Sequence, residues 1–381
     1  MPIFYTVLAS SFALVCIMIV ILTAFKKNKS KSEYYLIAIF TVFFLHMAID
    51  LTRFYYKEIN WYPHLVGLTS SFSFLYGPLF YYYFLSLTGR KGNILKRYWV
   101  FLLPFIIYFL INIPFILLDD NLKDEKFAIW MEGEFRKVLW WLNLVKVSFH
   151  FVFIYLIWKE FKVHRKNLKK YFSHQSDVLQ LLWFRKLIQF FVVIAIGAFV
   201  GNILSFGTEM KVYMKYDDLM FVIATGSLIY LFIYGIRHTD VFREYPDYSS
   251  LIVEDKANVE LKRKLVSDEQ EKDIRAKLEK AMEEDHLYLN PELSLNELAA
   301  HIGEKSYLVS AVINDMYDKT FFQYVNEKRV AHFKEIVKLP ESKNLTLFGV
   351  ASESGFNSKA SFNRIVKQLT GMTPSELVKS N

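Results

Sequence analysis

The chain has 381 residues, a formal net charge of +8 and a single cysteine, Cys16. This length allows two or three domains. One cysteine excludes a disulfide framework and a cysteine metal site, and we expect neither a metal nor a cofactor. The hydrophobic share of 53% is high for a soluble protein, and the apolar residues form long runs between Ile3 and Ile236, whereas charge becomes dense after Arg237. We therefore expect a first domain at residues 1–237.

Seven apolar runs are long enough to cross a lipid bilayer, which takes roughly 20 residues in a helix. The predicted spans are approximately Ile3–Phe25, Tyr34–Tyr56, Leu65–Leu87, Tyr98–Leu118, Val138–Trp158, Trp183–Phe206 and Leu219–Ile236. The first run has no basic residues before it and no small-residue cleavage site, which argues against a secretory signal peptide. Core helices of a soluble protein are the other interpretation, but these rarely stay apolar around their whole circumference over such a length.

Lys and Arg are unevenly distributed among the loops between these spans. The loops after spans one, three and five are basic, and residues 159–186 alone contain eight Lys and Arg. The loop after span four is rich in acid. Because positive loops stay on the cytoplasmic side, the N-terminus is predicted outside and the chain after Arg237 in the cytoplasm. This is the topology of a multi-pass membrane protein whose C-terminal domain is cytoplasmic.

Several polar side chains fall within the predicted spans, where ionisable residues mark functional sites by default. Those at helical spacing on one face of span two or of span five are His46, Asp50, Arg53, Asn143, Lys146 and His150. One hypothesis is a ligand pocket open to the outer side, with Asp50, Arg53 and Lys146 as its charged centre. The simpler alternative is a polar network that only joins the helices, since such interhelical bonds are common.

Residues 238–287 are predicted to be a cytoplasmic linker that contains one amphipathic helix. Ser267 and Gln270 have the spacing of a capping box. Four apolar residues follow at helical spacing, namely Ile274, Leu278, Ala281 and Met282. This stripe can pack on the next domain or on the same helix of a second protomer in a homodimer. Packing within the chain is the simpler interpretation.

A first helix-turn-helix pattern begins at Ser294. Ser294 and Glu297 form a capping box, and Gly303 is the left-handed residue expected where the helix ends. A second helix is predicted from about Ser306 to Asp315. Its residues nearer solvent or a DNA groove are Ser306, Tyr307, Ser310 and Asn314. A long connecting helix then runs from about residue 322 to 339 and ends at Pro340.

The second pattern is sharper. Thr346 is a natural N-cap, Gly355 supplies the turn, and Asn357 or Ser358 caps the next helix. The buried side of that helix is predicted from Phe362, Ile365 and Val366. The residues predicted to contact DNA are Ser358, Lys359, Ser361, Arg364 and Lys367. Recognition helices place such side chains against base edges and phosphates in the major groove.

Residues Tyr288 to Val378 resemble the DNA-binding domain of AraC/XylS-type transcription regulators. The resemblance rests on Gly355, Phe356, Phe362 and Arg364 and on the Thr-Gly-Met-Thr-Pro sequence from residue 370. It implies two helix-turn-helix units that enter successive major grooves about one DNA turn apart. With seven predicted spans ahead of it, the chain is similar to membrane-bound members from Bacteroidetes-like bacteria. This resemblance implies a multi-pass protein of the bacterial inner (cytoplasmic) membrane.

Three features depart from this family pattern. Lys305 stands where Ser usually opens the first recognition helix, so we expect capping to move to Ser306. Gly349 replaces a helix former at a cost of about 1 kcal/mol relative to Ala. From Asn290 onward there are 11 Lys and Arg against 10 Asp and Glu. Because bulk electrostatic attraction to DNA is therefore weak, local groove contacts, dimerisation or both must contribute.

The sequence predicts an all-α protein, a seven-helix transmembrane bundle followed by a cytoplasmic double helix-turn-helix domain at residues 288–381. The leading hypothesis is a one-component regulator that binds double-stranded DNA in response to an unknown small-molecule or membrane signal. The signal is expected to rearrange the seven membrane helices, and span seven and the linker helix are expected to transmit this rearrangement to the DNA-binding domain. A membrane receptor or transporter with a protein-interaction module is the alternative. No motif of an enzyme is present.

Overall fold

The computed structural model describes most of the chain as helices. It covers residues 2–27, 30–55, 62–88, 94–117, 133–173, 181–205, 223–224, 226–231, 233–234 and 268–380. Within these ranges the protein contains helices and one isolated β-bridge but no strand, which confirms the all-α prediction for them. The chain forms two compact units. The first unit is Met1–Phe161 with Leu181–Glu244, and the second unit is Lys162–Gln180 with Tyr245–Asn381.

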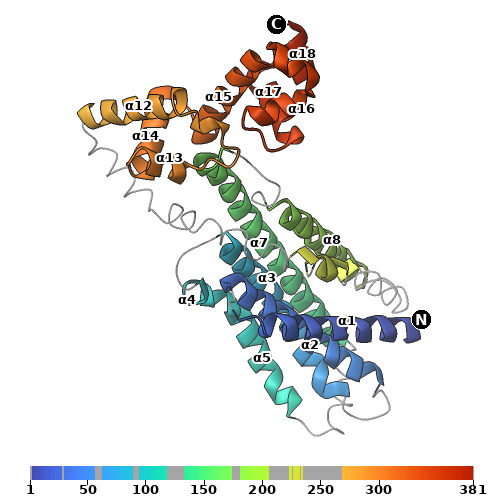
Figure 1. Cartoon of the computed structure of the whole chain (residues 1–381). Coiled ribbons are helices and arrows are strands. Elements are labelled where there is room, and N and C mark those ends of the chain that lie inside the picture. The colour runs from blue at the N-terminus through green and yellow to red at the C-terminus, as the bar shows by residue number, and fades with distance from the viewer. Residues whose placement is uncertain are drawn as a thin grey trace. The chain divides into compact units, whose positions relative to one another are not determined.

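The first unit contains long apolar helices, shown from blue to green in Figure 1. They are α1 (Pro2–Ala24), α2 (Lys31–Tyr55), α3 (Tyr62–Leu87), α4 (Ile94–Tyr98), η1 (Trp99–Leu102), α5 (Leu103–Ile116), α7 (Gly133–Tyr171) and α8 (Leu182–Ser205). Four segments among the described residues are long and apolar enough to cross a membrane: Lys31–Ile49, Ile94–Ile113, Trp140–Tyr171 and Leu182–Leu204. The predicted first, third and seventh spans are not among these four segments, and eight of the 18 residues of the seventh lie outside the described residues, so the count of seven stays a prediction.

Aromatic side chains hold the helices of the first unit together. Phe84 of α3 is fully buried, and its ring centroid lies 4.9 Å from that of Phe184 on α8 and 6.2 Å from that of Phe161 on α7. At Gly77, α3 approaches α7 so closely that an added Cβ would lie 2.5 Å from the Phe153 ring. The small residue therefore permits close helix packing.

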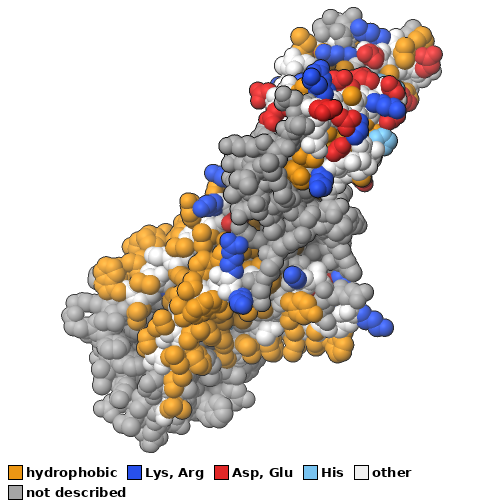
Figure 2. All heavy atoms as spheres, turned by 90° about the vertical axis from the view of Figure 1, so that its left-hand side faces the viewer, with side chains coloured by type: hydrophobic (Ala, Val, Ile, Leu, Met, Phe, Trp, Pro, Cys, Tyr) orange, Lys and Arg blue, Asp and Glu red, His pale blue; other side chains and the backbone are white. Residues whose placement is uncertain are grey.

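Large apolar side chains also cover much of the outside of these helices. Exposed examples are Leu110 and Ile111 on α5, Val152 and Tyr155 on α7, and Val193 and Ile196 on α8. Figure 2 shows hydrophobic side chains gathered over the displayed face of the first unit, whereas charged side chains are frequent on the described part of the second. Apolar faces of this extent are unusual on monomeric soluble proteins.

The second unit contains two small cores that share one helix. Its helices are α12 (Asp268–Glu283), η2 (Leu287–Leu289), α13 (Leu295–His301), α14 (Ser306–Tyr317), α15 (Phe321–Ile336), η3 (Pro340–Asn344), α16 (Leu347–Glu353), α17 (Lys359–Thr370) and α18 (Pro374–Ser380). Val309 and Val325 are buried in the first core with α12 and α13, while Phe333, Val350 and Phe362 are buried in the second. The helix α15 thus joins two helix-turn-helix units.

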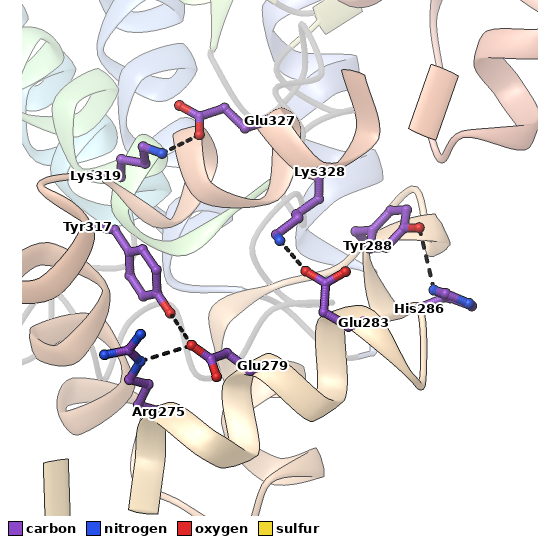
Figure 3. A network of polar contacts seen from close by, with 9 residues as sticks. All are labelled: Arg275, Glu279, Glu283, His286, Tyr288, Tyr317, Lys319, Glu327 and Lys328. Atoms are coloured by element: carbon purple, nitrogen blue, oxygen red, sulfur yellow. Dashed lines mark hydrogen bonds and ion pairs between the residues drawn. The ribbon is translucent and has the colours of Figure 1, made fainter. Parts of the chain in front are cut away.

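The amphipathic stripe of α12 packs within the chain. Ile274, Leu278, Ala281 and Met282 are buried in the same core as residues of α13 and α14. Polar contacts flank this core (Figure 3): Tyr317 of α14 and Arg275 both donate to Glu279, and Lys328 of α15 pairs with Glu283. The intrachain interpretation is confirmed. The predicted cap at Ser267 lies outside the described residues.

The length of α7 differs from the prediction. The sequence ends span five near Trp158 and assigns the basic residues that follow to a loop. The helix instead continues to Tyr171. Lys and Arg are good helix formers, so loss of hydropathy marks where a span would end but not where the helix ends. The last residues of α7 belong to the second unit.

Candidate nucleic-acid interface

The first helix-turn-helix unit is built by the predicted caps and glycine. Ser294 Oγ accepts from Glu297 N at 3.3 Å, and Glu297 Oε2 accepts from Ser294 N at 2.7 Å. Gly303 has φ of +72° and ends α13. The expected move of the next cap to Ser306 is wrong, because Lys305 is the N-cap of α14 and makes no side-chain capping bond. Ser306 Oγ donates instead to Asn296 at 2.5 Å.

The accessible part of α14 carries polar side chains, of which Tyr307 also packs against the first core. Ser306, Tyr307 and Ser310 are half-buried, and Asn314 is exposed with its amide donating to the Ser310 carbonyl at 2.6 Å. Buried apolar residues occupy the opposite side of the helix. Between residues 306 and 317 there is no Lys or Arg, and Asp315 is the only acid. This face can offer hydrogen bonds to base edges but little charge to phosphates.

In the second helix-turn-helix unit, the turn between the two helices requires a glycine. Thr346 Oγ1 accepts from Gly349 N at 3.0 Å and caps α16. Gly355 has φ of +88°, and an added Cβ would lie 2.5 Å from the Tyr288 carbonyl oxygen. Ser358 Oγ accepts from Ser361 N at 3.2 Å, which identifies Ser358, and not Asn357, as the cap of α17.

Most of the predicted contact residues of α17 are accessible. Ser358, Lys359, Arg364 and Lys367 are exposed. Ser361 is not, because only 8% of its surface is accessible. It lies four residues before buried Ile365 and thus on the same side of the helix, a signal that the sequence contained. Its assignment as a side chain that reaches DNA is not supported by this placement.

The sequence prediction also missed an exposed residue on α17. Asn363 is exposed like Arg364, which follows it, whereas Phe362 and Val366 are buried. Asn side chains can donate to and accept from base edges in the major groove. The spacing of the buried residues contains this information, since Asn363 is three residues from Ala360 and four from Lys367 on the same exposed face.

Charge is divided unequally between the two candidate recognition helices. Three basic residues and no acid lie between residues 359 and 370, whereas α14 contains no basic residue. Because the domain as a whole is nearly neutral, the basic residues of α17 and its neighbours must provide the long-range attraction to phosphates. The two units can therefore contribute differently, α17 through charge and α14 through neutral contacts.

The described contacts do not test the predicted membrane pocket. His46 Nδ1 is paired with the hydroxyl of Tyr76 on α3, and His150 Nδ1 lies 2.7 Å from the Lys146 carbonyl on its own helix. Asn143 is exposed and the Lys146 side chain is partly exposed. The side chains of Asp50 and Arg53 lie outside the described residues. Among described side chains no group could hold a metal ion. The pocket stays a hypothesis.

Comparison with known proteins agrees with this geometry. Residues 286–380 match a family model described as a helix-turn-helix domain. A stretch of 90 residues, 24% of this chain, is 29% identical to an uncharacterized HTH-type transcriptional regulator from Staphylococcus aureus (strain COL). That stretch spans 12% of the relative's length. No solved structure matches the chain significantly. The C-terminal region of this protein is a helix-turn-helix domain.

Proposed function

We propose that this protein is a membrane-bound one-component transcription regulator, which couples a signal at or across the membrane to sequence-specific binding of double-stranded DNA. One observation carries the proposal: the capped helix α17, which follows the Gly355 turn, exposes Lys359, Arg364 and Lys367 opposite its buried side. A helix of this kind after a tight turn is how helix-turn-helix proteins enter the major groove.

The proposed division of labour follows from the side chains. Arg364 reads a base edge by donating two hydrogen bonds, as Arg does with guanine. Lys359 and Lys367 bind phosphates and set the register of the helix. On α14, Ser310 and Asn314 supply neutral contacts in the neighbouring groove. Asn363 joins the base-reading group because it is exposed beside Arg364.

The exposed apolar surface of the first unit supports the membrane part of the proposal. Side chains such as Ile111, Val152 and Ile196 face outward from helices long enough to cross a bilayer. In water such a surface would drive association, whereas in lipid it has no such tendency. The basic loops orient these helices with the helix-turn-helix domain in the cytoplasm, where DNA is accessible.

A binding assay on the full-length protein in lipid nanodiscs tests the proposal. Duplexes are selected from a random pool by the wild-type protein, and affinities are then measured by fluorescence anisotropy at several salt concentrations. Arg364→Ala is expected to weaken binding by about 1–3 kcal/mol and to relax sequence preference at one base pair. Lys367→Ala is expected to weaken binding to all sequences and to reduce the salt slope by about 1.

Lys272→Ala is the matched control, because it removes an exposed cation from α12, outside the proposed interface. It is expected to leave affinity and salt slope unchanged. Failure of the wild-type protein to enrich any duplex would remove DNA binding from the proposal. That result would favour the second candidate, a receptor or transporter whose C-terminal domain binds a protein, which the near-neutral charge of the domain also favours.

A further inference from the structure

The chain directly after α7 is inserted into the second unit. Phe172 forms an antiparallel bridge with Ser294, and Ser173 N donates to the Leu293 carbonyl at 3.2 Å. Ser173 Oγ donates to the same carbonyl at 2.5 Å. Both residues are almost fully buried. Residues more than a hundred positions apart in sequence are thus joined, at the first turn of the helix-turn-helix domain.

Arg329 on α15 binds the segment formed by Phe172 and Ser173. Only 1% of its surface is exposed, and among the described residues no carboxylate pairs with it. Its guanidinium donates to the carbonyls of Tyr288 at 2.8 Å and Asn290 at 2.7 Å, and to Ser173 Oγ at 3.0 Å. Burial lowers the pKa of Arg329 to about 9, so the side chain is charged at neutral pH. A buried cation depends on such acceptors.

Arg329 also marks the joint between the two helix-turn-helix units. Two of its acceptors, the carbonyls of Tyr288 and Asn290, lie just before α13 of the first helix-turn-helix unit. The turn of the second helix-turn-helix unit lies against the same contact, since a Cβ added at Gly355 would lie 2.5 Å from the Tyr288 carbonyl oxygen and 3.0 Å from Arg329 Nε. The neighbouring Asn326 donates to the Ser173 carbonyl at 2.7 Å. One side chain therefore links both units and the end of α7.

We propose that Phe172 and Ser173 act as a clip that fixes the spacing of the two recognition helices, and that the clipped state is the one that binds DNA. This inference rests on the proposed function. Because α7 is one continuous helix from Gly133 to Tyr171, a rotation or shift of its apolar part acts directly on Phe172. The signal then reaches the domain through α7 in addition to the linker before α12.

The physical basis is the dependence of Arg329 on its acceptors. Withdrawal of Ser173 removes two acceptors, its hydroxyl and its carbonyl, from the buried guanidinium, and it leaves the amide of Asn326 without the same carbonyl. Loss of hydrogen bonds to a buried charge is more costly than loss of neutral ones, and the joint is expected to loosen to let water in. Two helices held at fixed spacing bind successive grooves with less ordering cost than two that move independently.

Ser173→Pro tests the clip, since proline removes both the N–H and the hydroxyl that bond Leu293. The full-length variant in nanodiscs is titrated with the duplex selected by the wild-type protein and with the same duplex lengthened between its two half-sites. The wild-type protein is expected to discriminate against the longer spacing. In Ser173→Pro this discrimination is expected to fall about tenfold, the equivalent of about one hydrogen bond to a charged group, that of Arg329 to Ser173 Oγ. Lys169→Ala, exposed on the same segment, is the control and keeps it.

A crosslink provides the reverse experiment within one molecule. Paired residues on adjacent antiparallel segments lie at a separation that a disulfide can span, so Phe172→Cys with Ser294→Cys, in a Cys16→Ser background, is expected to form one under mild oxidation. With Ser173→Pro added to this pair, the oxidised protein should discriminate between spacings, and the same protein after reduction should not. Comparison of the two forms separates the clip from any effect of the substitutions on folding.

The outcomes distinguish this inference from the proposed function. A wild-type protein that enriches no duplex defeats the function and the clip together. A wild-type protein that binds its duplex, with spacing discrimination equal in Ser173→Pro and in both crosslinking states, overturns the clip alone. Failure of the cysteine pair to crosslink also overturns it, because the Phe172 bridge would then not form in the intact protein.

Discussion

At the scale of single residues, two glycines of the second helix-turn-helix unit differ in what a side chain would meet. At Gly349, within α16, an added Cβ would have its nearest neighbours, Leu345 Cβ and Thr346 Oγ1, at 3.4 Å. We expect Gly349→Ala to stabilise α16 by up to about 1 kcal/mol, the helix propensity of Ala over Gly. The measurement is amide hydrogen exchange of residues 347–370 in the full-length protein, which reports local opening.

Gly355→Ala is the opposite case at nearly the same place. Its backbone is left-handed and its Cβ would overlap the Tyr288 carbonyl. We expect faster exchange across the same residues, because backbone strain and a steric overlap both act against the folded turn. Equal effects of the two substitutions would show that the environment of the Gly355 turn is not the one described here.

His332 should make the joint between the units sensitive to pH. Burial lowers the pKa of His332, with His286 acting in the same direction and Glu335 and Glu353 opposing. The folded protein therefore holds the neutral form at a pH where the unfolded chain, with a pKa near 6.5, takes up a proton. Its contribution to stability is present above about pH 6.5 and is lost as pH falls toward the lower, folded pKa.

The test is hydrogen exchange of residues 347–356, which include Ser354, at pH 7.5 and 5.5 after correction for intrinsic rates. Protection is expected to be lower at the acidic pH in the wild-type protein. In His332→Gln, which keeps a polar side chain near Ser354 Oγ, the difference between the two values should shrink. An unchanged pH dependence in this variant would assign it to other groups.

Single residues were predictable from the sequence where a local rule decides them. Ser294, Gly303 and Thr346 have the predicted roles, because capping and left-handed turns depend on neighbours within four residues. Ser361 is buried, which does not favour its predicted contact with DNA, and its spacing to Ile365 already indicates this side of the helix. Arg329 was not singled out as a site, since its bond to Ser173 joins positions 156 residues apart. No periodicity reports such a contact.

At the scale of elements, α12 is attached to the domain by both apolar packing and exposed ion pairs, and the two are expected to stabilise it to different extents. Leu278 is fully buried, whereas the side chain of Glu283, the partner of Lys328, is 62% exposed. We expect Leu278→Ala to destabilise the packing of α12 by about 2–5 kcal/mol. Glu283→Gln is expected to change it by at most about 1 kcal/mol, as exposed pairs do. Hydrogen exchange of residues 268–283 measures both. A larger effect from Glu283→Gln would reverse this ranking.

The sequence contains two further helix caps that the prediction did not include, whereas it does not specify where α7 ends. Thr320 with Gln323 and Thr373 with Glu376 have the spacing of capping boxes, and they cap α15 and α18. Both follow from the rule that identified Ser294. The extension of α7 is different, because its basic residues suit a helix and a loop equally well. The helix ends at Tyr171, next to the bridge that Phe172 forms with Ser294.

At the scale of the whole molecule, the contact of Ser173 constrains the proposed membrane topology. Ser173 bonds Leu293 and Arg329, so the end of α7 and the helix-turn-helix domain must be on the same side of a membrane. An even number of crossings must then lie between them. Since α8 is long and apolar enough to be one crossing, a second is needed before residue 268. The predicted span Leu219–Ile236 is the run that supplies it, which supports the seven-span proposal.

Cysteine labelling of right-side-out membrane vesicles checks this topology. In a Cys16→Ser background, a membrane-impermeant maleimide is expected to label Asp124→Cys, in the acidic loop predicted outside. Lys169→Cys at the end of α7 and Lys272→Cys on α12 should react only after the vesicles are opened, because both residues are exposed on the unit that contains the DNA-binding helices. Labelling of Lys169→Cys without that of Lys272→Cys would place them on opposite sides. The odd number of crossings between them would then contradict both the seven-span topology and the bond between Ser173 and Arg329.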